Sequence, residues 1–496
     1  MHRRNIILFV LFLGIFTLSF IGSDLQKAVS KSINFETPIE LNLSWVSGGK
    51  SPVLKKNKSE NKDFVSDQFL WADSLLNGMS LEEKVGQLFM IETYSNKSER
   101  YYQSIQEKIR KYHLGGLIFF QGTAPVQARL TNEYQSLSKT PLFIGMDAEW
   151  GLGMRLENTT SFPKQITLGA IKDNSLIEKM GEEIGWEMKR LGVHINFAPV
   201  ADINTNPENP VINYRSFGES KEDVTNKALA YARGLKKAGV IAVAKHFPGH
   251  GDTGTDSHVA MPVLNHSTER LTEQELVPFR QLINDSIGGV MTGHLFVPSL
   301  DSRPDRAATI SNKIVTGLLQ NQMGFNGLTF TDALNMRGIT NQFSSGGADL
   351  AAYIAGNDVL LQTGNLEAAY SKILAAFQNE DLDISDLDRR VHKILRAKYW
   401  AGLHQKPYVQ MAHLSEDLNN ARSIELKELL YKNAVTVLRA DREVIPFVQL
   451  DTLGIGTIAV GAPVGNAFQQ EISGFTNAVN YEMPKVQGYL RIMHTL

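Results

Sequence analysis

The side chains best suited to chemistry lie in one short segment, residues 244–258, which reads AKHFPGHGDTGTDSH. Its apolar start is typical of a buried strand and ends in the pair Lys245 and His246. A loop rich in Pro and Gly follows, which fits neither a helix nor a strand. The loop then presents Asp256 and His258 two residues apart. A carboxylate next to an imidazole fixes the tautomer of the ring and raises its proton affinity, so this pair is a candidate for a catalytic site.

Two other interpretations of this loop stay open on composition alone. It could be an ordinary polar surface loop, or it could bind a metal ion through its side chains. The possible ligands are His246, His250, Asp252, Asp256 and His258. Against the metal, the adjacent Lys245 would repel a dication, and no His-x-x-x-His pair in the segment could lie on one helix.

A second candidate is the carboxylate of Asp332, which ends the apolar run in residues 327–336, GLTFTDALNM. A carboxylate at this position can be a structural cap of the strand. It can also be a nucleophile, because retaining glycosidases attack the anomeric carbon of a sugar with such a group. The spacing alone favours neither role.

The apolar pattern indicates the scaffold that must position these residues. From Asp67 onward, short apolar runs alternate with longer segments of helical period, which is typical of βα units around a parallel sheet. We expect eight strands, at 87–92, 116–120, 142–147, 194–202, 240–246, 289–294, 328–332 and 358–362. The expected helices include 174–191, 221–238 and 268–286. This order predicts an α/β fold, a (β/α)8 TIM-type barrel, and no Gly-x-Gly-x-x-Gly turn follows the first strand to suggest dinucleotide binding.

Polar residues gather at the carboxyl ends of these runs, where a barrel of this kind carries its catalytic face. They are Asp147, Asp202, Lys245, His246, His294 and Asp332. A single polar strand end means little, because caps and turns are polar as well. Polar ends on five successive strands indicate an active site.

The composition excludes several classes of function. The 496 residues are 43% hydrophobic, which is enough for a large core and more than one domain. The formal net charge of −2 offers no basic field for nucleic acid, so we expect a neutral or small partner. The chain has no cysteine, which excludes disulfides, thiolate metal sites and a cysteine nucleophile.

The N-terminal segment predicts export. In residues 1–23, basic residues at 2–4 precede an apolar run from Ile6 to Gly22, which is typical of a signal peptide or a retained membrane anchor. We therefore expect a periplasmic or envelope-associated protein, with any membrane attachment through this segment only. Residues 24–66 are rich in Ser, Asn and Lys and predict a linker.

The expected barrel covers residues 67–405, and the character of the sequence changes after it. A helix at 415–433 and strands at 434–438 and 457–460 would begin a second α/β layer. We interpret residues 420–496 as a partial C-terminal α/β domain.

Both motifs resemble the β-N-acetylhexosaminidase branch of glycoside hydrolase family 3, through KHFPGHG with DSH and through TDALNM. The resemblance covers about residues 67–405. It implies that Asp332 is the nucleophile and that His258 is the acid/base, supported by Asp256. It further implies a carbohydrate substrate and no cofactor.

The resemblance also implies a set of sugar-binding residues. They are Asp147, Arg155, Arg215, Lys245 and His246. Many members of the branch have Glu-Gly-Gly-Arg after the first of these, whereas this chain has EWGLGMR at 149–155. Trp150 therefore either makes the rim of the leaving-group site bulkier or packs on the barrel. Asp202 could orient Arg215 and His294 could line the floor of the site, although a structural role suits each equally.

The expected function is that of a retaining exo-β-N-acetylglucosaminidase acting on peptidoglycan- or chitin-type glycans. One alternative is a family 3 β-glucosidase-type glycosidase, although those relatives generally take their acid/base from a second domain. Another is an N-acetylglucosaminide phosphorylase, because a neutral imidazole repels incoming phosphate less than a carboxylate would. A non-enzymatic wall-binding module is disfavoured by the presence of both Asp332 and His258.

Overall fold

The computed structural model describes residues 58–255, 261–304, 306–336, 339, 343–438, 447 and 452–483. The chain divides into two compact units, and of the described residues the larger unit holds those up to Val435 and the smaller unit those from Thr436 onward. The expected signal or anchor at 1–23 lies outside the described residues, and the expected domain limits stay predictions. Within the described part of the chain, no helix combines the length and apolarity that a membrane crossing requires.

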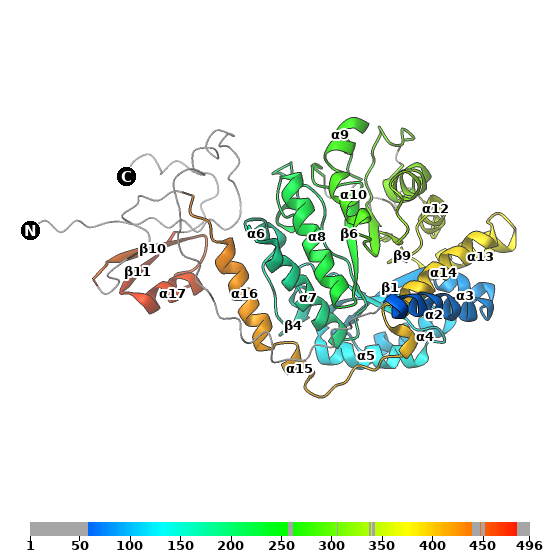
Figure 1. Cartoon of the computed structure of the whole chain (residues 1–496), viewed down its shortest axis with the longest axis horizontal. Helices are drawn as coiled ribbons and strands as arrows, with labels where there is room; N and C mark the ends of the chain where they lie inside the picture. The colour runs from blue at the N-terminus through cyan, green and yellow to red at the C-terminus, as the bar shows by residue number, and fades with distance from the viewer. Residues whose placement is uncertain are drawn as a thin grey trace, which may run out of the picture. The chain divides into compact units, whose positions relative to one another are not determined.

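Eight parallel strands form the closed sheet of the larger unit, and helices surround them (Figure 1). The strands are β1 (Phe89–Ser95), β2 (Gly116–Thr123), β3 (Phe143–Met146), β5 (Ile195–Asn196), β6 (Ile241–Phe247), β7 (Gly289–Thr292), β8 (Leu328–Thr331) and β9 (Leu360–Leu361). They pair in the order β8-β7-β6-β5-β3-β2-β1-β9, and β4 (Leu156–Glu157) pairs with β2. A bridge between Phe330 and Val359 joins the two ends of this order. The expected (β/α)8 barrel is confirmed.

Helices alternate with the strands along the chain. They are α2 (Lys58–Asn77), α3 (Leu81–Gly86), α4 (Glu99–Tyr112), α5 (Ala124–Leu137), α6 (Gln165–Gly169), α7 (Asn174–Arg190), α8 (Lys221–Lys237), α9 (Thr268–Glu273), α10 (Val277–Asn284), α12 (Gly347–Ala355), α13 (Leu366–Gln378), α14 (Ile384–Trp400), α15 (Leu414–Asp417) and α16 (Ala421–Ala434). A π-helical segment, η5 (Lys313–Gln322), follows β7. Ser98, Ser220 and Asp383 cap α4, α8 and α14 by accepting a backbone N–H from the first turn.

The barrel strands are buried on both faces, which is why their sequences are nearly continuous apolar runs. Strand β6, for example, is buried over its whole length. Inside the barrel, the rings of Phe197 and Phe330 pack edge to face with centroids 5.4 Å apart. Gly145 leaves room for this pair, because a Cβ there would lie 2.9 Å from the Phe197 ring.

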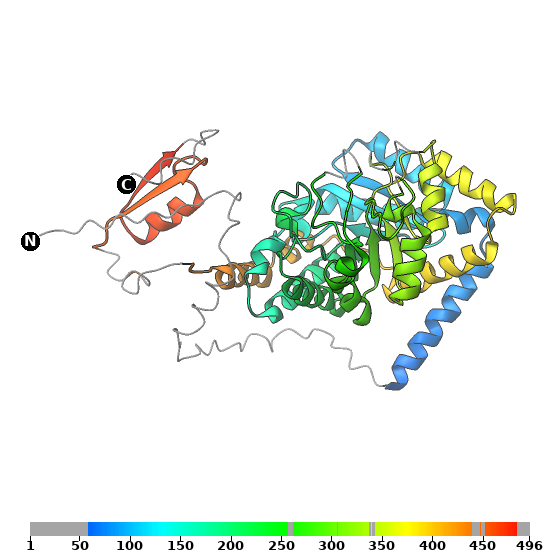
Figure 2. The same ribbon diagram turned by 90° about the horizontal axis from the view of Figure 1, so that it is seen from above.

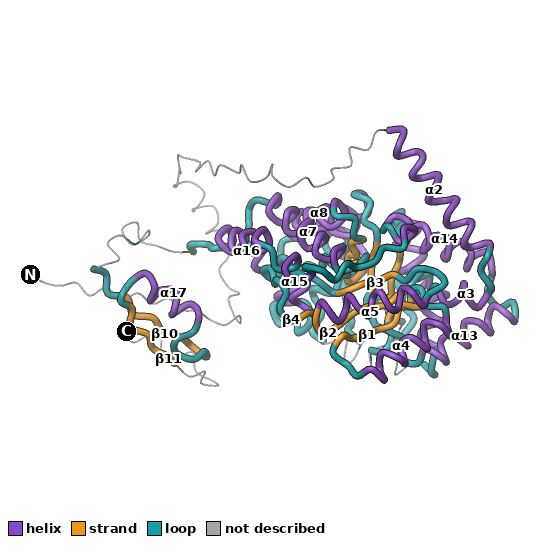
Figure 3. The backbone as a smooth tube through the Cα atoms, turned by 90° about the horizontal axis from the view of Figure 1, so that it is seen from below, coloured by secondary structure: helices purple, strands orange, loops and turns teal. Residues whose placement is uncertain are grey.

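Three expected elements differ from the structure. Helix α2 begins at Lys58, inside the expected linker, and points away from the barrel at its start (Figure 2 and Figure 3). Its later residues pack against α14, as Trp71 does against Tyr399. The expected helix at 268–286 is two helices, because Pro278 lacks the N–H that a continuous helix needs and lies instead in the first turn of α10. Glu275, between the two helices, is buried and binds Arg270 at 3.1 Å. Residues 434–438 form no strand: Ala434 ends α16, and the side chains that follow are exposed without a neighbouring strand among the described residues.

In the smaller unit, β10 (Ile455–Val460) and β11 (Ala478–Met483) pair in parallel, and helix α17 (Ala467–Phe475) connects them. This is a βαβ crossover, the connection that parallel neighbours require. Gln469 of α17 is buried and donates a hydrogen bond to the carbonyl of Tyr481 at 2.9 Å. The strand expected at 457–460 is part of β10.

Candidate active site

A cavity of about 220 Å³ opens at the carboxyl ends of the barrel strands. Six of the residues expected in the site line it, namely Asp147, Arg155, Arg215, Lys245, His246 and Asp332. Asp147 and Arg155 lie in the segment between β3 and β4, and Arg215 ends the short η3 turn (Asn213–Arg215). Lys245 and His246 lie in β6, and Asp332 follows β8. The barrel therefore brings together residues that are far apart in the sequence. The other two expected residues, Asp256 and His258, lie outside the described residues.

Asp147 lies between two cations at one wall of the cavity. Lys245 Nζ donates to its Oδ1 at 2.9 Å, and Arg155 Nη2 donates to its Oδ2 at 2.6 Å. Burial by itself would raise the pKa of Asp147, but Lys245 and Arg155 outweigh burial and hold the pKa well below its ordinary value. The carboxylate is therefore ionised and can accept hydrogen bonds from hydroxyl groups.

Glu149 is a member of this cluster that the sequence did not single out. Its carboxylate is fully buried and lies 2.7 Å from Arg215 Nη2 and 2.8 Å from Lys245 Nζ. Burial raises its pKa, but Arg215 and Lys245 outweigh burial and lower the pKa to about 2. A signal was present, because Glu149 follows Asp147 by two residues at the end of a strand, the spacing that places side chains on one face.

Asp202 holds His246 rather than Arg215, which corrects one expectation. Its Oδ2 lies 2.7 Å from His246 Nδ1, and its carboxylate accepts the backbone N–H groups of His246 and His250. With Nδ1 engaged, His246 directs Nε2 toward Arg215 Nη2 at 3.5 Å. Burial, and then His246, lower the pKa of His250 to about 4, so His250 is neutral above that pH.

Asp332 follows β8 and faces the cavity with an ionised carboxylate. The backbone N–H of Ala333 donates to its Oδ1 at 2.8 Å. Burial raises the pKa of Asp332, but His294, His246 and this N–H outweigh it, so the pKa is below its ordinary value. His294 lies between Thr309 Oγ1 and the Ala333 carbonyl, both at 2.9 Å. It supports the turn that carries Asp332, but it does not line the cavity.

The loop that contains Asp256 and His258 starts and ends on anchored positions. On one side, Asn209 donates to the carbonyl of His250 at 2.8 Å, and His250 lines the cavity. On the other side, Leu264 N–H donates to the carbonyl of Phe296 at 2.9 Å. The loop therefore begins at the edge of the candidate site.

The metal interpretation of this loop finds no support in the part of the chain that the structure describes. There, no group of three or more His, Asp or Glu side chains is arranged to hold an ion. Asp252 instead lies 2.7 Å from His266 Nε2. His250 Nδ1 lies 2.6 Å from Thr253 Oγ1.

Trp150 stands beside the site without lining its cavity. Its ring lies 6.4 Å from that of Tyr214, and Lys164 Nζ lies 3.9 Å from the Tyr214 centroid and 5.3 Å from that of Trp150. Its carbonyl accepts the N–H of Phe162 at 2.9 Å. Trp150 thus belongs to a packed rim cluster, which favours the packing interpretation of this residue.

Known proteins of one family are similar to this chain in sequence and in fold. Residues 80–397 match the glycosyl hydrolase family 3 N terminal domain. The chain is 40% identical over 281 residues to β-hexosaminidase A of Pseudoalteromonas piscicida, covering 52% of this chain and 47% of the relative. It is 29% identical over 414 residues to a β-N-acetylglucosaminidase/β-glucosidase of Cellulomonas fimi, covering 80% and 72%.

Among solved structures, the chain is similar to a glycoside hydrolase family 3 β-N-acetylglucosaminidase from Paenibacillus sp. str. FPU-7. The TM-score is 0.71 at 32% identity, and the match covers 82% of this chain and 80% of that one. The chain spans about half the length of the Pseudoalteromonas piscicida relative. By its matching domain and its barrel, the chain belongs to glycosyl hydrolase family 3, and within that family it is similar to the β-hexosaminidases.

Proposed function

We propose that the protein is a retaining exo-β-N-acetylglucosaminidase that removes terminal β-linked N-acetylhexosamine from peptidoglycan- or chitin-type glycans. The observation that carries the proposal is the ionised carboxylate of Asp332 in one small cavity with Asp147, Lys245 and Arg155. A nucleophile and several hydroxyl-binding groups there suit a single sugar ring. The names of the relatives support an N-acetylated sugar.

The reaction would proceed by double displacement. Asp332 attacks the anomeric carbon, the glycosidic C–O bond breaks, and His258 as imidazolium gives its proton to the departing oxygen. A glycosyl ester on Asp332 remains. His258 then takes a proton from water, whose oxygen displaces Asp332 and restores the original anomeric configuration. An imidazole with an ordinary pKa of about 6.5 can play both roles near neutral pH.

The charged wall of the cavity would bind the sugar. Lys245, Arg155 and Arg215 donate to hydroxyls and to the acetamido carbonyl, and Asp147 accepts from hydroxyls. Glu149 is a positioning residue, because it holds Lys245 and Arg215 through its own carboxylate. The ionic contacts fix these donors before the substrate arrives, which lowers the cost of orientation at the transition state.

A β-glucosidase-type activity is the second candidate, because the name of the Cellulomonas fimi relative includes both activities. Aryl β-N-acetylglucosaminide and aryl β-glucoside, assayed side by side, separate the two. We expect kcat/KM to be at least about tenfold higher for the acetamido sugar, a difference that a site built to hydrogen-bond the acetamido group easily reaches. Faster hydrolysis of the glucoside would contradict the proposal.

The same assay in phosphate buffer tests phosphorolysis. We expect free sugar at every phosphate concentration, and a sugar 1-phosphate product would instead identify a phosphorylase. Activity should also survive exhaustive EDTA treatment, because no metal takes part in the proposed steps. Activity lost with EDTA and restored by zinc or manganese would revive the metal interpretation of the histidine-rich loop.

His258 and Asp256 are tested as one unit. His258→Ala should slow substrates with poor leaving groups far more than activated aryl glycosides, because only the former need a proton to depart. Azide should restore turnover of the activated substrate, since an anion needs no general base. Asp256→Asn should lower the upper pKa of the pH–rate profile, because Asp256 raises the proton affinity of the ring.

The matched control is His266→Ala, because His266 follows the same loop and binds Asp252 outside the cavity. His266→Ala should lower the rate of hydrolysis by the same small factor for substrates with poor leaving groups and for activated aryl glycosides. Equal losses on good and poor leaving groups in His258→Ala, with no rescue by azide, would exclude His258 as the acid/base.

We also propose that residues 1–23 direct export to the periplasm or cell envelope, followed by a linker, the catalytic barrel within 67–405 and a partial α/β domain at 420–496. The basic and apolar order of the first residues supports this. Fractionation of the producing cells, with the mass of the mature N-terminus, distinguishes a cleaved signal from a retained anchor. Recovery of the uncleaved chain in the cytosol would contradict export.

A further inference from the structure

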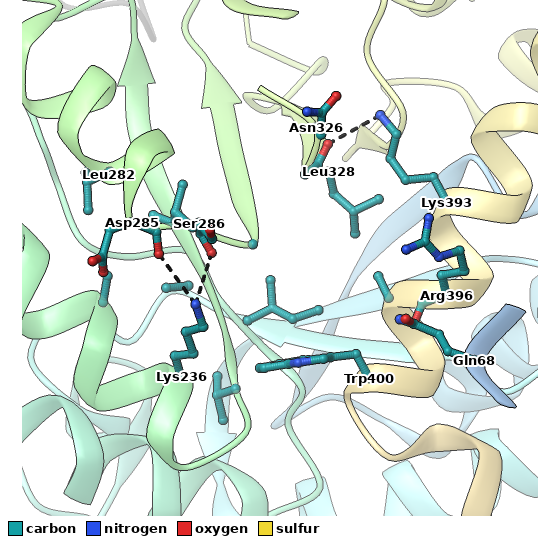
Figure 4. A pocket seen from close by; sticks show the side chains of 18 residues that line it. Gln68, Lys236, Leu282, Asp285, Ser286, Asn326, Leu328, Lys393, Arg396 and Trp400 are labelled. Carbon is teal, nitrogen blue, oxygen red and sulfur yellow. Dashed lines mark hydrogen bonds between the residues drawn. The ribbon is translucent and has the colours of Figure 1, made fainter. Parts of the chain in front are cut away.

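A second and larger cavity, of about 340 Å³, lies at the opposite end of the barrel from the candidate site. It opens at the amino ends of β6, β7 and β8, and helices α2, α8, α10 and α14 contribute to its walls. None of its lining residues lines the candidate active site. Figure 4 shows its interior.

The body of this cavity is apolar. Trp400 from α14 presents its ring to the interior, and the aliphatic side chain of Leu328 faces the same space (Figure 4). Ile241 lines the cavity as well. A flat ring over aliphatic neighbours suits a ligand with an apolar body, because every apolar surface that it covers leaves water.

Three of the four charged side chains that line the cavity are cationic. In Figure 4, Arg396 and Gln68 reach in from one side and Lys236 from the other. Lys393 is compensated, because it binds Asp358 Oδ2 at 2.9 Å. The carboxylate that lines the cavity, Asp285, is occupied by Arg233 at 2.7 Å.

Arg396 and Lys236 lack such compensation. Lys236 Nζ reaches only the carbonyls of Asp285 and Ser286, at 3.4 and 3.5 Å. Arg396 stacks over the ring of Phe69 at 3.8 Å, and its Nε is buried with no hydrogen-bond acceptor. Among the described residues, neither side chain forms an ion pair with a carboxylate.

For Arg396 this is costly, because its buried Nε loses water without gaining an acceptor, whereas Lys236 is exposed and stays hydrated. Burial accordingly lowers the pKa of Arg396. A buried polar atom without a partner in a native protein calls for an explanation, and a bound ion is one of them. An anionic group at Arg396 would supply the missing acceptor. The Gln68 amide donates one N–H to the Arg396 carbonyl at 2.7 Å, and its second N–H could donate to the same anion.

We propose that this cavity is a second binding site, separate from the candidate active site, for a small amphipathic organic anion. Its carboxylate, sulfonate or phosphate group binds Arg396 and Gln68, and its flat apolar body lies between Trp400 and Leu328. Lys236 stands at the other end of the cavity and adds a second, weaker attraction. Such a ligand would link α2 and α14 to the amino ends of β6 and β8.

Binding of 2-naphthalenesulfonate to the full chain, measured by isothermal titration, tests this site. Its neutral counterpart, 2-naphthalenesulfonamide, has the same apolar body without the charge. We expect one sulfonate per chain and binding at least about tenfold weaker for the sulfonamide, because a buried charge-assisted hydrogen bond contributes that much. Arg396→Gln should weaken sulfonate binding by a similar factor, and Arg396→Lys should retain most of it.

The matched control is Arg389→Gln, on the same helix α14, where Arg389 pairs with Asp386 outside the cavity. It should leave sulfonate binding unchanged, and none of these variants should alter glycoside hydrolysis. Equal sulfonate binding by wild type and Arg396→Gln would overturn the proposal. So would equal affinity for the sulfonamide, or the absence of one-to-one binding at millimolar ligand.

Discussion

At the carboxyl ends of the barrel strands, Asp147 and Glu149 lie against Lys245 and Arg215, so buried charges of both signs compensate each other. At the amino ends, Lys398 is equally buried but has a neutral partner, Gln87 Oε1 at 2.6 Å. His194 at that end accepts the backbone N–H of Ile144 at 3.1 Å. Arg396 and Lys236, which line the second cavity, likewise lack a carboxylate among the described residues.

Burial by itself always disfavours the charged form of a side chain. The difference between the two ends shows that a neighbouring opposite charge decides whether a buried side chain stays charged. At the carboxyl ends, cations outweigh burial and lower the pKa of Glu149 to about 2, so its charge persists. At the amino ends, burial lowers the pKa of Lys398 to about 7 and, with nearby lysines, that of His194 to about 3. The carboxyl ends of the strands therefore keep fixed charges, whereas the amino ends tend toward neutrality.

Among the buried charges at the carboxyl ends of the strands, we expect the removal of Asp332 to have the largest effect on activity. Asp332→Asn should leave the fold intact and reduce kcat by at least about a thousandfold, because an amide cannot form the glycosyl ester. In wild type, the acid limb of the pH–rate profile due to Asp332 should lie below the ordinary aspartate pKa, since His294 and His246 lower it against burial. Steady-state kinetics with circular dichroism check both points.

The control for this variant is Asp349→Asn, the same change at a buried carboxyl outside the site. Burial raises the pKa of Asp349 to about 6, so an amide resembles its protonated form. Activity should stay within a few-fold of wild type. Wild-type-like turnover by folded Asp332→Asn would eliminate Asp332 as the nucleophile.

The next effect is at Glu149, where Glu149→Gln leaves Arg215 and Lys245 without a buried counter-charge. We expect a loss of about 3 kcal/mol in the free energy of unfolding, the usual result of breaking a buried pair, and about a hundredfold in kcat/KM from misplaced donors. The folded-state pKa of Glu149 is depressed to about 2 from 4.5. Its contribution to stability is therefore present above pH 4.5 and is lost as the pH falls toward 2.

Urea denaturation of wild type and Glu149→Gln across that pH range measures the difference. The two curves should converge in acid. An unchanged free energy of unfolding near neutral pH would mean that the charges at the carboxyl ends are not coupled as the distances indicate.

The positions of the strands could be predicted because each is a short apolar run, and the carboxyl-end residues could be predicted because the barrel points them to one face. Glu149 could not be predicted, because it lies three residues beyond the end of β3 at Met146 and lacks a motif of its own. For Asp202 the sequence left open whether it orients Arg215 or has a structural role. Its contact with His246 depends on the close approach of residues 200 and 245, which is a tertiary feature.

Local composition misled the prediction elsewhere. The start of α2 is rich in Lys, Asn and Ser, which favours a linker by composition, but packing beside α14 stabilises the helix. The helix expected at 268–286 has the right apolar spacing, but it contains Pro278, which is tolerated only in the first turn of a helix and here lies in the first turn of α10. The cations at the amino ends could not be found from sequence, because nothing local distinguishes Lys398 from an exposed helical lysine.

The smallest expected effect is at Lys398, where we expect a change in the slope of the free energy of unfolding against pH. In the folded state its pKa is lowered to about 7 from 10.5, so between these values the unfolded state binds more protons. The free energy of unfolding should therefore rise with pH in that window, by about 1.4 kcal/mol per unit for one proton. Lys398→Met keeps the apolar bulk but removes the proton, so the difference between wild type and variant should grow in favour of wild type.

Urea denaturation at about pH 6 and about pH 9 measures this difference, and subtracting the variant removes the contribution of every other titrating group. Lys179→Met is the control, because Lys179 is exposed on α7 and its removal takes no charge from the interior. The difference in the free energy of unfolding between Lys179→Met and wild type should be the same at both pH values. A flat difference for Lys398→Met as well would mean that Lys398 keeps its proton despite burial. The amino ends of the strands would then hold their charge as firmly as the carboxyl ends, and the contrast between the two would rest on the position of the charges rather than on their state.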